Sequence, residues 1–428
     1  MAGEWAMIPL GKLANNYDAR RIPLSNRERE HRRGPYPYYG ATGIMDYVDD
    51  FLFEGLHLLV AEDGSVERPD GTPFVQLADG RFWVNNHAHV LRADTDEETR
   101  FLYYALRTVQ VGPFVSGSVQ PKLSQVNLNR IPVPYPTNVD ERRAITHVLS
   151  TLDDRIELNR RMSETLEEMA RALFESWFVR FDPVRAKMEG RDPGLPSDLA
   201  DLFPDRLVDS ELGEVPEGWQ VATLADHFDA TKGVSYKGSQ LGDGVPLHNL
   251  NSIYEGGGYK YEGIKFYSGE YSERHAVRPG DVIVANTEQG HDRLLIGYAA
   301  LVPAAFGNDG VASHHIYRMR PRRNSPLTAP YLCHLLNSRW MHDIVSGYAN
   351  GTTVNMLPID GVQKPLIVVP PAALVSAFDS FAMNAERKRE LAHVQSRTLA
   401  ALRDSLLPKL ISGELRVKDA ERLVAAAT

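Results

Sequence analysis

Residues 140–179 read DERRAITHVLSTLDDRIELNRRMSETLEEMARALFESWFV. Apolar side chains recur in this stretch at spacings of three and four, the period of a helix with one buried face. One polar residue, Asn159, interrupts the stripe. Residues 373–411 repeat the pattern, and Gly413 follows at the place where a helix would end. The stripes consist of Ile145, Leu149, Leu152, Ile156, Leu166, Leu173 and Trp177, and of Leu374, Phe378, Phe381, Ala385, Leu399, Leu402, Leu406 and Leu410.

The two predicted helices are long enough to require a partner. At 1.5 Å per residue, about 40 residues make a rod of roughly 60 Å, whose apolar stripe must be buried. The simplest partner for each rod is the other rod. The chain can return to an equivalent position only if the rods pack antiparallel, so we expect an antiparallel coiled coil with pseudo-two-fold symmetry. The connection Phe181–Val215 carries apolar residues that would hold it against the rods: Leu199, Leu202, Phe203 and Leu207.

The two segments that precede the helices resemble each other. The run Trp5–Leu10 recurs at Trp219–Leu224, and the tripeptide Val115–Gly117 recurs at Val345–Gly347. Both segments are rich in turn residues and in short β-branched or aromatic runs, which predict short strands with some helix. We therefore expect a mixed α+β protein with an internal repeat. Chance similarity between two α/β domains is the alternative.

The composition is that of an ordinary globular chain. Its 428 residues, 43% of them hydrophobic and 24% charged, suggest two or three domains. The single cysteine, Cys333, cannot form an internal disulfide. No apolar run approaches the roughly 20 residues that span a bilayer, so a cytoplasmic protein with no membrane partner is expected. The net charge of -9 does not by itself favour nucleic acid as a partner.

Sequence motifs for catalysis are missing or incomplete. There is no GxxxxGK[ST] phosphate loop, and the run Gly242-Asp-Gly244 lacks the third glycine of a dinucleotide fingerprint. The pairs His87-Ala-His89 and His314-His315 have no cysteine or carboxylate at ligand spacing, so no metal site is predicted. Both pairs occupy equivalent places in the two copies, where they could face a ligand or simply close a turn. We expect no catalytic residue and no bound cofactor.

Basic residues gather in two places within the repeated segments. Residues 20–33 hold six arginines and run into an aromatic loop, and residues 318–323 hold four more with no acid between them. Guanidinium groups beside tyrosines suit contacts to phosphates and base edges, although a solvated, salt-bridged surface explains any one of them as well. The candidates are Arg20, Arg21, Arg27, Arg29, Arg32, Arg33, Tyr36, Tyr38, Arg318, Arg320, Arg322 and Arg323.

A Gly/Ser loop precedes the last predicted strand in each copy. Its backbone amides could hold an anion, or the loop could be a plain turn. Residues 1–137 hold 14 Lys and Arg against 17 Asp and Glu, and residues 216–372 hold 13 against 14. Segments so close to neutral would bind DNA weakly alone and need a partner that supplies further phosphate contacts. The loop candidates are Ser116, Ser118, Lys122, Thr352 and Thr353.

Four features together resemble the specificity (S) subunit of type I restriction-modification systems. They are the repeated unit with a tryptophan near its start, the VSG loop, a strand that ends in IPVP, and a long helix that begins near Asp140. The centre is similar too, with WFVRFDPVRAKME at 177–189 and DLFPDRLVDSELGEVPEGW at 201–219. The resemblance covers the whole chain. It is weakest inside the repeated segments, where no motif can be aligned to name base-reading residues.

The resemblance implies a non-catalytic DNA-reading scaffold. Two target-recognition domains would each read one half of an asymmetric, interrupted site in double-stranded DNA. The helices would set the gap and dock two methyltransferase subunits, which a translocating restriction subunit would join. S-adenosylmethionine, ATP and Mg²⁺ are expected on those partners. The expected segments are recognition domain 1 (1–137), a central helix (138–180), a connection (181–215), recognition domain 2 (216–372), a C-terminal helix (373–413) and a tail (414–428).

Apolar surface beyond what one helix pair needs would receive helices of the partners. The predicted docking residues are Leu166, Leu173, Phe174, Trp177, Phe178, Leu399, Leu402, Leu406 and Leu410. Two other hypotheses remain open. One is an adaptor whose coiled coil joins two ligand-binding domains without DNA, and the other is an enzyme with an unrecognised active site.

Overall fold

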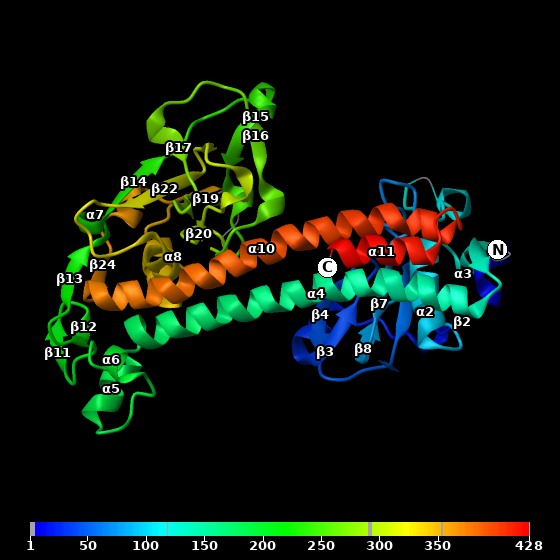
Figure 1. Ribbon diagram of the computed structural model, residues 1–428, viewed down its shortest axis with the longest axis horizontal. Helices are drawn as coiled ribbons and strands as arrows, with labels where there is room; N and C mark the ends of the chain where they lie inside the picture. Colours follow the sequence, from blue (N-terminus) through cyan, green and yellow to red (C-terminus); the bar gives the residue numbers. More distant parts are fainter. Residues whose placement is uncertain (1–4, 118, 290–292, 352–353, 428) are drawn as a thin grey trace. The chain divides into compact units, whose positions relative to one another are not determined.

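The computed structural model describes residues 5–117, 119–289, 293–351 and 354–427. The chain forms two compact units, the first of residues 1–158 and 395–428 and the second of residues 159–394. Helix α4 (Val139–Phe174) begins in the first unit and ends in the second, whereas α10 (Ala372–Ile411) begins in the second and ends in the first (Figure 1). Each unit therefore contains part of both long helices. The six segments expected from the sequence remain a prediction.

Two four-stranded sheets form the globular part of the first unit. Its elements are β1 Trp5–Pro9, β2 Asn15–Asn16, α1 Asn26–His31, β3 Arg33–Tyr39, β4 Ile44–Val48, β5 Phe53–Glu54, β6 His57–Ala61, β7 Val75–Ala78, β8 Arg81–Val84, β9 Ala88–Arg92, α2 Asp96–Leu106, α3 Gln125–Arg130, β10 Pro132–Pro136 and α11 Val417–Ala427. The sheet orders are β2-β9-β6-β7 and β4-β3-β8-β5, and β1 pairs with β10. Strand β6 is buried at every residue and lies between β7 and β9, so this apolar run forms the centre of its sheet.

The second unit repeats this arrangement of strands. Its elements are α5 Asp182–Met188, α6 Ser197–Ala200, β11 Leu207–Ser210, β12 Gly213–Pro216, β13 Gln220–Thr223, α7 Leu224–His227, β14 Phe228–Lys232, β15 Leu241–His248, β16 Lys265–Tyr267, β17 Ala276–Val277, β18 Val282–Ala285, β19 Thr287–Gln289, β20 Ala299–Leu301, β21 Gly310–Ala312, β22 Ile316–Pro321, α8 Ala329–Asn337, α9 Arg339–Gly347, β23 Val354–Met356 and β24 Leu366–Val369. The orders β14-β22-β18-β20 and β16-β15-β21-β17 match those of the first unit position by position. Strand β3 runs parallel to β8, and β15 runs parallel to β21. This shared topology confirms the predicted internal repeat.

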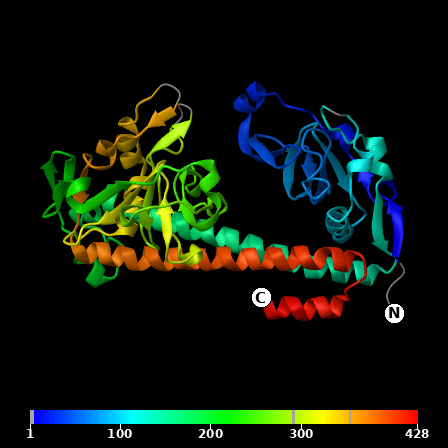
Figure 2. The ribbon, with the colours of Figure 1, turned by 90° about the horizontal axis from the view of Figure 1, so that it is seen from above.

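The long helices pack antiparallel within the second unit, with the strands on one side of the pair (Figure 2). Going along α4, Asn159 Nδ2 donates to the Ala392 carbonyl at 3.4 Å, and the Phe174 ring lies 5.4 Å from that of Phe378. Between them, Arg389 donates to Glu167 at 2.7 Å. Residue numbers rise on one helix as they fall on the other, which confirms the predicted direction. Asn159 is buried, so its polar contact helps to fix the register of the pair.

In the first unit the helices close the core beneath the sheet. Arg403 of α10 donates to Asp153 of α4 at 2.6 Å, and Asp153 also accepts from the Tyr104 hydroxyl at 2.6 Å. Helix α11 adds Ala420 and Val424 to this core. The stripe residues buried there are Ile145, Leu149, Leu152, Leu399, Leu406 and Leu410. The prediction that Leu399, Leu406 and Leu410 offer surface to a partner is therefore wrong, because the chain covers them itself.

The same correction applies at the end of α4. A π-helical turn, Glu175–Val179, places Trp177 and Phe178 inside the second core, where Phe174 is also buried. Phe181 follows in the left-handed region at φ 57°, and its ring packs edge-on against Trp219. The connection thus folds back onto the helices, as expected, with Phe203 fully buried and Leu199, Leu202 and Leu207 partly buried. Phe174, Trp177 and Phe178 serve this internal contact instead of forming a docking surface, while Leu166, Leu173 and Leu402 are only partly buried.

The end of α10 depends on a glycine. Gly413 has φ 75°, a conformation that side chains rarely tolerate, and a Cβ there would lie 2.6 Å from Trp5 Nε1. The predicted helix stop is confirmed. In the described part of the chain, the helices are all too short or too polar to span a bilayer.

A buried histidine makes the second unit sensitive to acid. His248 is buried, its Nδ1 lies 2.8 Å from the Tyr259 hydroxyl, and burial lowers its pKa to about 4. Because the unfolded chain takes up this proton first, the stabilisation is complete above about pH 6.5 and is lost as the pH falls towards 4. Between pH 7 and pH 5 this histidine should cost about 2 kcal/mol of unfolding free energy.

The test compares the wild type with His248→Gln, which can keep the hydrogen bond to Tyr259 but cannot be protonated in this range. Urea unfolding at pH 7 and pH 5 should show a smaller pH-dependent loss in the variant. Equal losses in both proteins would contradict the assignment.

Candidate functional site

The strongest candidate site lies where the central strands end. In the first unit β6 ends at Ala61, which pairs with Ala88, the first residue of β9. In the second unit β18 ends at Ala285, which pairs with Ile316, the first residue of β22. The residues just outside these pairs occupy matching positions in the two units. We call them the strand-end site: residues 62, 63 and 85–87 in the first unit, and residues 286, 287 and 313–315 in the second.

The predicted Gly/Ser loops close against the same strand ends. Ser116 and Lys122 exchange backbone hydrogen bonds, and the next amide, Leu123 N–H, donates to the Glu62 carbonyl at 2.7 Å. In the second unit Asn350 and Met356 make the equivalent bonds, and Leu357 N–H donates to the Asn286 carbonyl at 2.8 Å. Ser116 is exposed and its hydroxyl donates to the Lys122 carbonyl at 3.1 Å. The predicted residues Ser118, Thr352 and Thr353 lie outside the described part of the chain.

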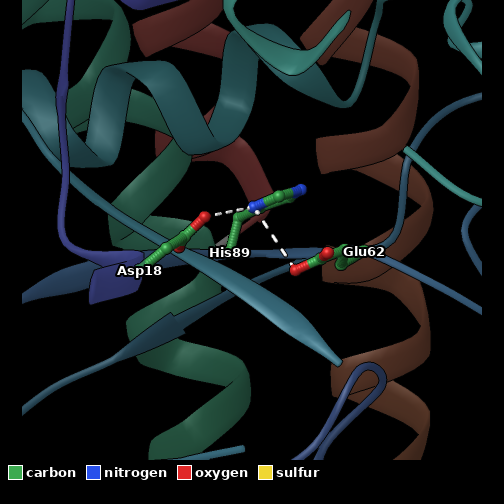
Figure 3. A group of neighbouring side chains, drawn as sticks. All are labelled: Asp18, Glu62 and His89. Atoms are coloured by element: carbon green, nitrogen blue, oxygen red, sulfur yellow. Dashed lines mark hydrogen bonds and ion pairs between the residues drawn. The ribbon is translucent and has the colours of Figure 1, made fainter. Parts of the chain in front are cut away.

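An ion cluster supports the strand-end site of the first unit (Figure 3). His89 of β9 is buried, and its Nδ1 lies 2.5 Å from Asp18 Oδ2 and 3.7 Å from Glu62 Oε2. Arg21 donates to Glu62 at 2.7 Å, and Lys122 lies 3.2 Å from the other oxygen of the same carboxylate. Lys122 therefore anchors the Gly/Ser loop to the sheet while half of its side chain stays exposed.

The cluster has the residue types of a metal site, but its groups already satisfy one another. His89 Nε2 lies 2.7 Å from the Leu123 carbonyl, so both ring nitrogens already have an oxygen partner within the protein. Burial raises the pKa of the Asp18 carboxyl, but the hydrogen bond and the charge of His89 oppose this effect. The pKa of Asp18 is therefore below its ordinary value. The pKa of Glu62 is also lowered against the effect of burial, by Arg21, His89 and Lys122. These residues fit a closed ion network better than a metal centre.

The carboxylates of this cluster could not be found from sequence spacing. Asp18 is 71 residues from His89 in the chain, and only the β2-β9-β6 pairing brings Asp18, Glu62 and His89 together. The sequence did mark His89 as a polar residue in a repeated place. It carried no signal for the two carboxylates, because exposed acids are common in any chain.

The matching positions of the second unit have a different charge. By strand register, Lys232 at the end of β14 takes the place of Asp18, Asn286 that of Glu62, and Tyr317 that of His89. Two acids and a histidine are thus replaced by one cation and two neutral groups. Further basic side chains lie nearby, because the charges of His314 and Lys265, as well as that of Lys232, act on His315. The same backbone frame therefore presents different chemistry in the two units.

Three of the predicted DNA-binding residues are structural. Arg29 is buried and donates to Asp46 at 3.1 Å, and the Tyr38 ring beneath it is 1% exposed. Arg318 is buried and donates to the Ala276 carbonyl at 2.8 Å. The prediction is wrong for these residues, because neither their charges nor their rings are accessible to a ligand.

The remaining predicted residues differ in how far their side chains are committed. Arg20 stacks on Phe53 and donates to the Leu52 carbonyl, and the Tyr36 ring packs on Phe51. Four arginines are held by carboxylates: Arg21 by Glu62, Arg32 by Asp49, Arg320 by Asp281 and Arg322 by Asp229. Arg27, Arg33 and Arg323 are exposed and form no salt bridge with the described residues. Sequence clustering alone could not separate these classes.

Removing His89 should expose the dependence of the first unit on its ion network. His89→Leu leaves the buried Asp18 carboxylate with hydrogen bonds from Asn16 and Val90 and with Arg21, at 3.5 Å, as its remaining ion partner. Breaking a buried pair in this way should lower the unfolding free energy by about 3 kcal/mol. Asp18→Asn combined with His89→Leu should recover part of that loss, because no buried charge is then left unpaired.

Urea unfolding of the single and double variants measures these differences. Zinc or a chelator should leave the wild-type melting temperature unchanged. Strong stabilisation by a divalent cation would contradict the closed network.

The chain is similar to known proteins of one kind. Residues 2–168 match the family model described as the type I restriction modification DNA specificity domain. The type I restriction enzyme MjaIX specificity subunit of Methanocaldococcus jannaschii is 22% identical over 450 residues, covering 97% of each chain. A Haemophilus influenzae protein provisionally named a type I restriction enzyme specificity subunit is 39% identical over 133 residues, 31% of this chain and 33% of that protein. The latter match spans about a third of the relative.

A solved structure shares the fold. The S subunit of a type I restriction-modification system from M. genitalium aligns over 95% of this chain and 96% of its own, with a TM-score of 0.57 and 16% sequence identity. At this identity the similarity concerns the fold, a mixed α+β arrangement with long helices.

Proposed function

We propose that this chain is a type I restriction-modification specificity subunit and that it reads DNA for a methyltransferase and nuclease complex. Each globular segment, 1–137 and 216–372, recognises one half of a bipartite, asymmetric site in double-stranded DNA. The chain itself is a non-catalytic subunit. The adaptor without DNA and the unrecognised enzyme are not favoured by the family match.

One observation carries the proposal of two readers. The same pair of four-stranded sheets occurs twice, but the charges in and beside the strand-end site differ between the copies, with Asp18 and Glu62 in one and Lys232 and Asn286 in the other. A duplicated scaffold that served one symmetric ligand would be expected to keep the same groups. Divergent groups on one frame suit the two different halves of an asymmetric sequence, because base edges are distinguished by the donors and acceptors presented to them.

The long helices are proposed to set the gap between the half-sites. Each runs without interruption from one unit to the other, so the path between the readers consists of helix rather than flexible linker. Each residue added to the helices would then increase the distance between the half-sites by about 1.5 Å. The partly buried Leu166, Leu173 and Leu402 remain candidates for contact with two methyltransferase subunits.

The partners supply what this chain is proposed to lack. Methyltransferase subunits would bind S-adenosylmethionine and methylate adenine, and a restriction subunit would use ATP and Mg²⁺. The exposed Arg27, Arg33 and Arg323 remain candidates for phosphate contacts. Because the recognition segments are close to neutral, most contacts to the DNA phosphates would come from the other subunits of the assembled complex.

Exchange of one recognition segment tests the two-reader model. The full chain is co-expressed with its cognate methyltransferase, and adenine methylation is mapped across a genome. A bipartite motif is expected. Replacing residues 1–137 by those of a relative should change one half of it and leave the other half and the gap unchanged. A change in both halves, or in neither, would show that the segments do not read separately.

An insertion into both long helices tests whether their length sets the gap between the half-sites. Four residues of helix-forming sequence inserted after Asn159, with four more inserted at the matching level of α10 beside Ala392, add about 6 Å to both helices and preserve their pairing. The methylated motif should keep both halves but gain a longer gap, or methylation should cease. The same four residues placed in the exposed turn at Gly194 serve as the control. Efficient methylation of the original motif by the helix variant would contradict the proposal that helix length sets the gap.

A further inference from the structure

Two histidines occupy the same place in the duplicated frame. His87 directly precedes the pair Ala61–Ala88, and His315 directly precedes the equivalent pair Ala285–Ile316. Most surrounding positions differ between the copies in residue type. The histidine is retained although neither side chain fills a core, since His87 is exposed and His315 is half-buried.

Each imidazole is oriented through the same ring atom. His87 Nδ1 lies 2.6 Å from Asp63 Oδ1, and His315 Nδ1 lies 2.9 Å from Thr287 Oγ1. Asp63 and Thr287 both sit two residues beyond the end of the central strand, so the geometry is repeated while the oxygen partner changes from a carboxylate to a hydroxyl. A partner at Nδ1 sets the tautomer and ring direction of a histidine. Neither Nε2 makes a hydrogen bond to a described residue.

The surroundings of His315 suit a polyanion. Burial, and then the charges of His314, Lys232 and Lys265, lower the pKa of His315, and no acid is among the groups that act on it. Lys232 and Lys265 form no salt bridge with the described residues. Lysines without counter-ions beside a half-buried histidine favour a ligand that is itself anionic.

The surroundings of His87 are more selective. The Asp63 carboxylate accepts a hydrogen bond from His87 Nδ1–H, and in this tautomer Nε2 is the hydrogen-bond acceptor of the ring. The exposed Asn86 is its immediate neighbour, and the half-exposed Lys122 closes the loop beside it. An acceptor at this place matches the exocyclic amino groups of adenine and cytosine, which face the major groove.

We propose that His87 and His315 are specificity-determining or positioning contacts to DNA, one in each half-site, each presenting Nε2 from the strand-end site. The inference rests on the proposed DNA-reading function and goes beyond it by assigning the contacts to these two residues. It also gives a reason for the histidine pairs that the sequence left open between a ligand contact and a turn.

The variants are His87→Ala and His315→Ala in the full chain, co-expressed and purified with the methyltransferase. Matched controls are His31→Ala in the first unit and His275→Ala in the second, which remove histidines away from the strand ends. Binding to a duplex that carries the mapped motif should weaken about 5- to 100-fold for each strand-end variant. The two controls should bind as the wild type does.

Methylation mapping distinguishes the kinds of contact. Relaxed base preference in one half of the motif, a different half for each variant, identifies a base contact. Uniformly weaker binding with an unchanged base preference identifies a positioning contact. Either result supports the proposal. Unchanged motif and affinity in both variants, or one variant altering both halves, would overturn it.

Two further measurements keep the result interpretable. Asp63→Ala and Thr287→Ala retain the histidines but release their rings, and should give a smaller loss of binding than removal of the histidine itself. If either His→Ala variant melts below the wild type, His→Gln at the same position replaces it. If the wild-type complex yields no bipartite methylated motif, the DNA-reading function fails as well. If the wild-type complex yields the bipartite motif and the histidine variants change neither the motif nor the affinity, only this inference fails.

Discussion

Burial of two long apolar stripes is the constraint on which the rest of this structure depends. Helices α4 and α10 are too long and too apolar on one face to stand in water, and each contributes to two cores. In one core Leu149 and Leu152 meet Leu399 and Leu406, and in the other Phe174 meets Phe378. The globular sheets complete these cores, so neither the helices nor the sheets can be removed without exposing apolar surface.

This sharing of cores has a consequence for partner binding. Aromatic residues at the end of α4 look like spare surface in the sequence, but a π-helical turn and the left-handed Phe181 direct the chain back over them. Their burial stabilises the connection instead. Polar contacts then refine the pairing of the helices, with Arg389 between Glu167 and Glu386 and Arg403 beside Asp153. Such buried or half-buried pairs add register more than free energy.

Duplication separates the frame of the protein from its chemistry. Strand order and register are kept in the two units, because the apolar central strands β6 and β18 require the same neighbours. Residues just past the strand ends are free of that requirement. At or beside these ends, Asp18, Glu62 and His89 form a closed ion network in one unit, while Lys232, His314 and His315 supply basic side chains in the other. Recognition of different ligand halves can therefore change without change in the core.

The sequence by itself determined the helices, their antiparallel pairing, the internal repeat and the resemblance to specificity subunits, because periodicity and repeated motifs are local patterns that survive without coordinates. It also placed the histidine pairs at equivalent points. Only the tertiary structure decided which charges are available. Arg29 and Arg318 cluster in sequence with exposed arginines but are buried, and Asp18 reaches His89 across 71 residues of chain. Burial and ion pairing depend on strand pairing over long separations, and composition or spacing carries no record of that pairing.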